Sequence, residues 1–123
     1  MTIINMDEFK IWFKKAKKDL KAARHSLASG DYDWASFQAH QSVEKALKSI
    51  YIKKIKRLIK IHDLSQLAKK INAPRDIVIL CNEINPVYID TRYPDIPKEY
   101  NKGDAELLIN KAEEVLRWIG KNL

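Results

Sequence analysis

The sequence predicts an all-α fold, an antiparallel up-and-down bundle of four to five helices. Only three glycines and four prolines occur in 123 residues. Between them, apolar residues recur at intervals of three and four almost throughout, which is the helical period. Long helices joined by short links pack as antiparallel neighbours, so a bundle follows. The length fits one domain over residues 1–123.

The first two helices carry the clearest periodicity. The first is expected to start near Asp7 and to end at Gly30. Its apolar side comprises Phe9, Trp12, Phe13, Ala16, Leu20, Ala23 and Leu27. Its lysines point largely elsewhere, namely Lys14, Lys15, Lys17, Lys18 and Lys21. The second helix is expected to start near Asp31 or Asp33 and to continue through Tyr51 into a basic run.

Shorter elements follow. A third helix is expected from His62 or Asp63, as its cap, to Ile71, closed by Asn72 and Pro74. A fourth should start near Arg75 or Asp76 and bury Ile77, Leu80, Cys81 and Ile84. The Asn85–Pro86 step should kink or end it, because proline lacks an amide donor and disfavours a helical residue before it.

The last third of the chain should hold a loop and a final helix. Residues 88–103 contain Pro94, Pro97 and Gly103 and are interpreted as a long ordered loop. Asp104 is the expected N-cap of the last helix, which should run to Gly120. Its buried face comprises Ala105, Leu108, Ala112, Val115, Leu116 and Ile119.

The charge is concentrated in the first half. The net charge is +7, and residues 1–61 hold 14 basic and 6 acidic side chains. The densest basic patch comprises Lys53, Lys54, Lys56 and Lys60 together with Arg57. Such a patch attracts polyanions, with nucleic acid the leading candidate. The alternative is a solvated helix face.

Several function classes find no support in the sequence. The longest apolar run, residues 77–81, is far shorter than a membrane span, and no signal peptide is evident, so we expect a cytoplasmic protein. Isolated glycines form no phosphate loop. The three histidines and single cysteine lack the spacing of a metal site, so we expect neither a metal nor another cofactor.

The second helix has two faces that carry apolar side chains. Tyr32, Ala39, Val43, Ala46 and Ile50 form a core stripe. The opposite arc holds two aromatic residues among polar ones, namely Trp34, Phe37, Gln41, Glu44, Lys45 and Lys48. Aromatic side chains there suggest cover by another helix or a partner subunit. The alternative is a solvent-exposed i,i+4 pair of Glu44 and Lys48.

Four motifs resemble the HEPN (higher eukaryotes and prokaryotes nucleotide-binding) domain family over nearly the whole chain. Residues 39–48 read AHQSVEKALK, preceded by GDYDWA at 30–35. HDL at 62–64 and RYPD at 92–95 follow, and the final helix also fits. The resemblance implies a helical bundle that usually forms a homodimer. It also implies a minimal nucleotidyltransferase as partner in a two-component, toxin–antitoxin-like pair.

Many members of the family are metal-independent ribonucleases with an arginine four to six residues before a histidine. Arg57 and His62 have this spacing, although Leu58 occupies a place that is often polar. By that resemblance His62 would act as general acid or base and Arg57 would stabilise phosphorane charge. The alternative is structural, with His62 at a helix entry and Arg57 in the basic run.

A second group surrounds Arg92. With Tyr88, Tyr93 and Asp95, Arg92 could pair a phosphate while a ring stacks on a base. Alternatively, Arg92 could form a salt bridge with Glu44 that anchors the loop. The leading hypothesis is therefore a nucleotide- or RNA-binding HEPN protein that partners a nucleotidyltransferase. The alternatives are a ribonuclease toxin and a non-catalytic dimerisation module.

Overall fold

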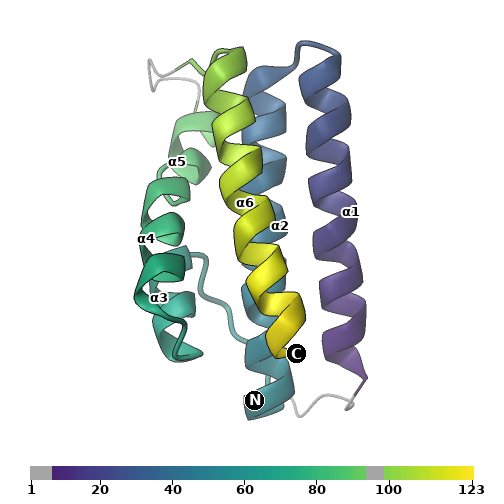
Figure 1. Cartoon of the computed structure of the whole chain (residues 1–123), viewed down its shortest axis with the longest axis vertical. Coiled ribbons are helices and arrows are strands. Elements are labelled where there is room, and N and C mark those ends of the chain that lie inside the picture. Colours follow the sequence, from purple (N-terminus) through teal and green to yellow (C-terminus); the bar gives the residue numbers. More distant parts are fainter. Residues whose placement is uncertain (1–6, 94–98) are drawn as a thin grey trace.

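Three long helices and three short ones make up the described part of the chain. The computed structural model describes residues 7–93 and 99–123. The helices in these residues are α1 (Glu8–Ala28), α2 (Tyr32–Ile55), α3 (Leu64–Lys70), α4 (Arg75–Ile84), α5 (Val87–Arg92) and α6 (Lys102–Asn122). The chain rises through α1 and descends through α2 (Figure 1). The start of α3 lies beside the end of α4, where the Leu64 amide donates to Asn85 Oδ1, so α3 runs antiparallel to α4. The chain returns through α4 and α5 and descends again through α6. The predicted all-α bundle is confirmed.

Helix α2 lies at the centre of the bundle. It packs against α1, α3, α5 and α6, and 13 of its 24 residues are buried. Buried serines satisfy their hydroxyls within the helix, as when Ser42 Oγ donates to the carbonyl oxygen of Ala39 at 2.7 Å. Because neighbours surround α2, it needs small or apolar residues on most of its circumference.

Helix ends follow local chemistry. Gly30 has φ of 82°, a left-handed conformation that favours glycine, and α1 stops just before it, as predicted. Asp63 caps α3 by accepting a hydrogen bond from the Gln66 amide at 3.0 Å. Of the two predicted caps, Asp63 is therefore the one used.

The predicted loop over residues 88–103 is wrong at both ends. Pro86, with φ of −61°, starts the six-residue helix α5, and Val87 is buried; proline favours the start of a helix because its φ is preset. Asn101, rather than Asp104, caps α6, and the Asp104 carboxylate accepts a hydrogen bond from the Asn101 amide in return. This capping box places Gly103 inside the helix, which ends at Asn122 rather than Gly120.

The predicted basic patch is divided between a helix and a linker. Lys53 and Lys54 belong to the last turn of α2, and Lys56 follows in a left-handed conformation with φ of 62°. Arg57 and Lys60 lie in the segment that connects α2 to α3. Across residues 7–93 and 99–123, no helix is both long and apolar enough to cross a membrane.

Candidate functional site

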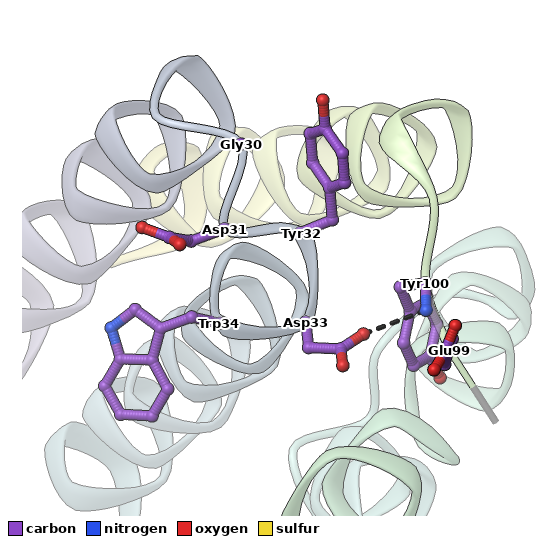
Figure 2. Close-up of a pocket in the computed structure, with 7 residues that line it drawn as sticks. All are labelled: Gly30, Asp31, Tyr32, Asp33, Trp34, Glu99 and Tyr100. Carbon is purple, nitrogen blue, oxygen red and sulfur yellow. Dashed lines mark hydrogen bonds between the residues drawn. The ribbon is translucent and has the colours of Figure 1, made fainter. Parts of the chain in front are cut away.

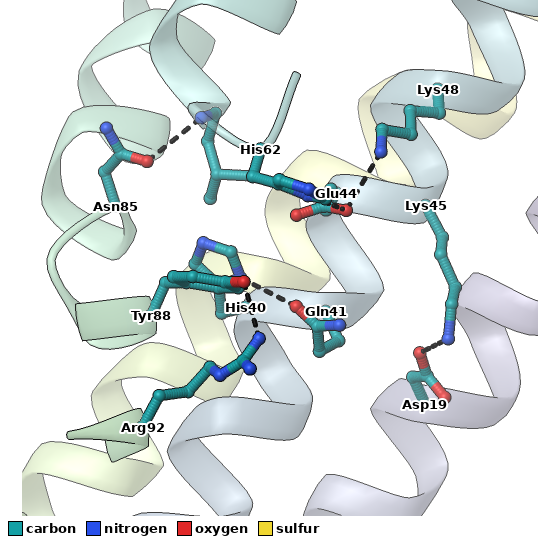
Figure 3. A network of polar contacts seen from close by, with 11 residues as sticks. Asp19, His40, Gln41, Glu44, Lys45, Lys48, His62, Asn85, Tyr88 and Arg92 are labelled. Atoms are coloured by element: carbon teal, nitrogen blue, oxygen red, sulfur yellow. Dashed lines mark hydrogen bonds and ion pairs between the residues drawn. The ribbon is translucent and has the colours of Figure 1, made fainter. Parts of the chain in front are cut away.

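A buried carboxylate on α2 gathers two basic side chains. Glu44 Oε2 lies 3.1 Å from Lys48 Nζ and 3.1 Å from His62 Nδ1 (Figure 3). The side chains of Glu44 and Lys48 are 8% and 7% exposed, so the surface-pair interpretation is wrong. The side chain of His62 is 58% exposed. Glu44 therefore ties an exposed imidazole to a buried charged pair.

Tyr88 stands between His62 and Arg92. The rings of His62 and Tyr88 are nearly parallel, with centroids 5.8 Å apart and an interplanar angle of 11°. Arg92 Cζ lies 4.9 Å from the Tyr88 ring centroid, and Arg92 Nη1 donates to the Tyr88 hydroxyl at 2.5 Å. Helix α5 places Tyr88 and Arg92 one turn apart, which brings both to the same face. The result is a row of imidazole, phenol and guanidinium, which we call the His62–Tyr88–Arg92 row.

The alternative of an Arg92–Glu44 salt bridge is wrong. In the described chain Arg92 contacts Tyr88, whereas Glu44 accepts hydrogen bonds from Lys48 and His62. Lys48 lies one helical turn from Glu44 and can therefore contact its carboxylate. Arg92 lies on α5, on the other side of Tyr88 from His62 (Figure 3). The guanidinium stays at the surface, since Arg92 is exposed.

The other predicted residues lie around this centre or away from it. Half-buried Gln41 accepts from His40, and Lys45 pairs with Asp19 of α1. Tyr93 is 50% exposed at the end of α5. Asp95 lies outside the described residues. The structure thus brings Gln41, Glu44, Lys48, His62, Tyr88 and Arg92 together on one side of α2.

Arg57 and His62 both lie in the linker between α2 and α3. The polar and ring contacts of His62 are with Glu44 and Tyr88. Arg57 is exposed near the start of the linker.

Comparison with known families identifies the chain. The family profile described as "HEPN domain" matches residues 9–123. The chain belongs to the HEPN domain family. The resemblance found in the motifs at residues 39–48, 62–64 and 92–95 is confirmed.

Three solved structures share this fold. ST0689, an archaeal HEPN homologue, is 31% identical with a TM-score of 0.80, covering 93% of this chain and 96% of its own. TT1696 from Thermus thermophilus is 28% identical with a TM-score of 0.87, and the coverages are 95% and 99%. A HEPN domain protein from Thermotoga maritima, tm0613, is 22% identical with a TM-score of 0.71 and coverages of 89% and 94%, and shows the fold alone. No curated protein matches the sequence.

Sequence reasoning missed two residues of this HEPN site. His40 is fully buried, and its ring centroid lies 5.4 Å from that of Tyr88. Asn85 Oδ1 accepts from the Leu64 amide at 3.0 Å and so fixes the start of α3 beside His62. The available signals were a histidine one turn before Glu44, and an asparagine that was interpreted only as part of a helix break at Pro86.

Two buried polar atoms lack a partner within the described HEPN chain. They are Nε2 of His40 and Oε1 of Glu44. The hydrogen bond from His40 Nδ1 to Gln41 Oε1, at 3.2 Å, assigns the imidazole proton to Nδ1 and leaves Nε2 as an acceptor. Buried polar atoms without partners are uncommon and accumulate where function competes with stability.

An open pocket adjoins the His62–Tyr88–Arg92 row. It has a volume of about 380 Å³ and is lined by His62, Asp63, Asn82, Asn85, Pro86, Tyr88 and Ile89. Apolar walls with a few polar groups are typical of small-molecule sites. Among residues 7–93 and 99–123, no group of three His, Cys, Asp or Glu side chains is placed to hold a metal ion.

A larger pocket lies elsewhere, at the turn between α1 and α2 (Figure 2). Its volume is about 510 Å³, and it is lined by Gly30, Asp31, Tyr32, Asp33, Trp34, Glu99 and Tyr100. Asp33 Oδ1 accepts from the Tyr100 amide at 2.8 Å, which ties the chain before α6 to the start of α2. Three acidic side chains make this pocket unfavourable for phosphates, so we place the candidate site at the smaller one.

Burial of His40 makes stability depend on pH. Burial lowers the pKa of His40 below its ordinary value of 6.5, against the opposing effects of the Gln41 hydrogen bond and the Glu44 charge. The unfolded chain therefore binds a proton at a pH where the folded chain does not. We expect the free energy of unfolding to keep its full value above pH 6.5 and to decrease as the pH drops toward the lowered pKa of His40. Urea denaturation across this range measures it.

Two variants separate this effect from general acid sensitivity. His40→Leu should flatten the pH dependence, because the titrating group is removed. His25→Gln, at an exposed histidine of α1, should retain it. Equal pH dependence in His40→Leu and the wild type would exclude His40 as the cause.

Proposed function

We propose that the chain, as a single HEPN domain over residues 1–123, is a cytoplasmic nucleotide- or RNA-binding partner of a minimal nucleotidyltransferase. In this proposal it acts as a homodimer in a two-component, toxin–antitoxin-like pair. The observation that carries the binding function is the His62–Tyr88–Arg92 row beside an open pocket. The nucleotidyltransferase partner is supported by family membership.

The chemistry of the row suits a nucleotide. Arg92 donates a hydrogen bond to the phenol of Tyr88 rather than to a carboxylate. The positive charge of its guanidinium can therefore pair with a phosphate. His62 and Tyr88 offer aromatic surface for a base, and base–aromatic stacking contributes about 1–3 kcal/mol. The pocket volume of about 380 Å³ lies within the range of about 300–1,000 Å³ for small-molecule sites.

Titration of the purified protein with ATP and with polyuridine RNA tests this proposal. Tyr88→Ala should weaken binding by about tenfold or more, since the ring that joins His62 to Arg92 is lost. Ile79→Ala, at a 48% exposed residue of α4, is the matched control and should bind like the wild type. Absence of binding to both ligands, or equal binding by both variants, would refute the binding function.

Exposed aromatic side chains support a second subunit. Trp34 is 57% exposed, and its ring lies 5.4 Å from that of Phe37. These residues line an open pocket of about 370 Å³ with Thr91 and Arg92. Contiguous exposed apolar surface marks interaction sites. Sedimentation analysis should give a dimer for the wild type and a monomer for Trp34→Ser; a monomeric wild type would exclude the homodimer.

Ribonuclease activity is the second candidate, favoured by the contact between Glu44 and His62. A buried carboxylate at Nδ1 orients the imidazole and leaves Nε2 for proton transfer, as in other acid–base sites. Arg57 would stabilise the phosphorane. With a metal chelator present, His62→Ala should reduce cleavage of single-stranded RNA by about 10²–10⁴-fold. A wild type that does not cleave would contradict this function.

A further inference from the structure

The outer face of α1 is a stripe of lysines. Lys10, Lys14, Lys17, Lys18 and Lys21 are all exposed. The opposite side of the helix is buried through Ala16, Leu20 and Ala23. At 100° per residue, the lysines fall on one side of α1, and Lys15 lies at its margin. We call this set the α1 lysine stripe.

The stripe is long and regular. At 1.5 Å per residue, Lys10 to Lys21 spans about 17 Å. Lys14, Lys18 and Lys21 follow one another at intervals of four and three residues, so neighbouring ammonium groups lie along a line. At its start the stripe meets the end of α2, where Lys53 Nζ lies 5.1 Å from the Phe9 ring centroid. The basic residues of both helices thus meet at the same end of the bundle.

Little negative charge opposes the stripe. Lys10 pairs with Asp7 at 3.6 Å, and both side chains are more than two-thirds exposed. Of the two acidic residues of α1, Glu8 lies in the first turn and Asp19 pairs with Lys45 of α2. Arg24 nearby pairs with Glu113 of α6. In the described part of the chain, no carboxylate lies within 4.0 Å of Lys14, Lys18 or Lys21.

This arrangement of like charges destabilises α1 in the protein without a bound ligand. Like charges four residues apart repel, and the pairs 10–14, 14–18 and 17–21 are all of this kind. A bound polyanion would relieve the repulsion. A surface that only served solubility would gain from carboxylates mixed among the lysines, as on the outer face of α6, where Glu106, Glu113 and Glu114 accompany Lys111 and Arg117.

We propose that the α1 lysine stripe binds the phosphate backbone of single-stranded RNA, as a surface separate from the His62–Tyr88–Arg92 row. Lysines on flexible stems contact phosphates as point charges without reading sequence. An anionic membrane fits less well, because the apolar side of α1 is packed in the bundle and Ile11, 50% exposed, is the large apolar residue beside the stripe. This inference rests on the RNA binding proposed above.

The test removes three charges from the stripe and three from elsewhere. The variant Lys14→Gln/Lys18→Gln/Lys21→Gln is compared with Lys69→Gln/Lys70→Gln/Arg75→Gln, which has the same net charge and alters exposed residues at the end of α3 and the start of α4. Binding of polyuridine RNA is followed by fluorescence anisotropy from about 50 to about 200 mM salt. The stripe variant should lose at least tenfold in affinity, and its log–log salt slope should fall by about 2.

Thermal melting supplies a second readout. Without RNA, the stripe variant should melt at the same temperature as the wild type or higher, because repulsion within α1 is reduced. The control variant should keep most of its affinity and the wild-type salt slope. Loss of RNA binding together with a lower melting temperature would overturn the inference, since damage to the fold would explain it.

The remaining outcomes separate the inference from the proposed function. Suppose that Tyr88→Ala weakens RNA binding and the stripe variant keeps the wild-type log–log salt slope. This result would overturn the proposal for the stripe and leave the proposed function standing. No RNA binding by the wild type would overturn the stripe, and it would overturn the proposed binding function as well only if ATP also failed to bind. Sedimentation with phosphatidylserine vesicles is run in parallel, and vesicle binding that exceeds RNA binding and is lost in the stripe variant would assign the stripe to a membrane instead.

Discussion

Glu44→Ala is expected to lower the free energy of unfolding by about 3–5 kcal/mol. The substitution leaves the Lys48 ammonium, whose side chain is 7% exposed, without its carboxylate. It also frees His62, which loses the hydrogen bond that holds its Nδ1. Urea denaturation measures the loss. Glu114→Ala, at an exposed residue of α6, should change the free energy of unfolding by less than about 0.5 kcal/mol.

A double variant distinguishes the charged pair from packing. Glu44→Leu/Lys48→Met replaces both charges with apolar groups of similar size, which is often neutral or stabilising. We therefore expect it to recover most of the stability that Glu44→Ala loses. Nucleotide or RNA binding should be weaker than in the wild type, because His62 still lacks its hydrogen bond to Glu44. A double variant as unstable as Glu44→Ala would contradict this explanation.

The contrast between stability and function clarifies why α2 carries these charges. A helix surrounded by α1, α3, α5 and α6 gains little from a buried ion pair, since desolvation offsets the attraction. Glu44 Oε1 and His40 Nε2 are moreover left without partners among the described residues. The polar centre of the bundle is therefore better explained by what it orients, His62 and Tyr88, than by what it stabilises.

Long helices could be predicted from the sequence because each presents many turns of periodic information. The ends of α1 and α6 lie within about three residues of the prediction. Helix α5 could not be predicted, because six residues show too few turns for a period, and its start depends on Pro86 and on burial of Val87. The N-cap of α6 was misplaced because Asn101 and Asp104 are both good caps, and the reciprocal hydrogen bonds decide between them.

Most residues of the candidate site could be predicted from the sequence, but the contacts between them could not. The face carrying Gln41, Glu44 and Lys48 follows from helical spacing, and Tyr88 and Arg92 follow from the family motifs. Which base pairs with Glu44 depends on how the linker before α3 crosses α2, and no local pattern encodes that crossing. His62 therefore took the place predicted for Arg92. His40 was missed because a buried histidine has the same spacing as a core residue.

Leu47→Ala tests the enclosure of α2 directly. The two predicted faces of α2 both omit Leu47, yet its side chain is fully buried. Truncation to alanine should lower the free energy of unfolding by about 2–5 kcal/mol, as for other buried leucines. Urea denaturation measures the loss.

Leu107→Ala is the matched control, because Leu107 belongs to α6 and is 54% exposed. This substitution should change the free energy of unfolding by about 0.5 kcal/mol or less. If Leu47→Ala were equally mild, one side of α2 would be open to solvent. The burial of Glu44, Lys48 and His40, on which the orientation of His62 depends, would then need another explanation. A large loss at Leu47 would instead support a low-dielectric centre, where one carboxylate can fix the position of an exposed imidazole.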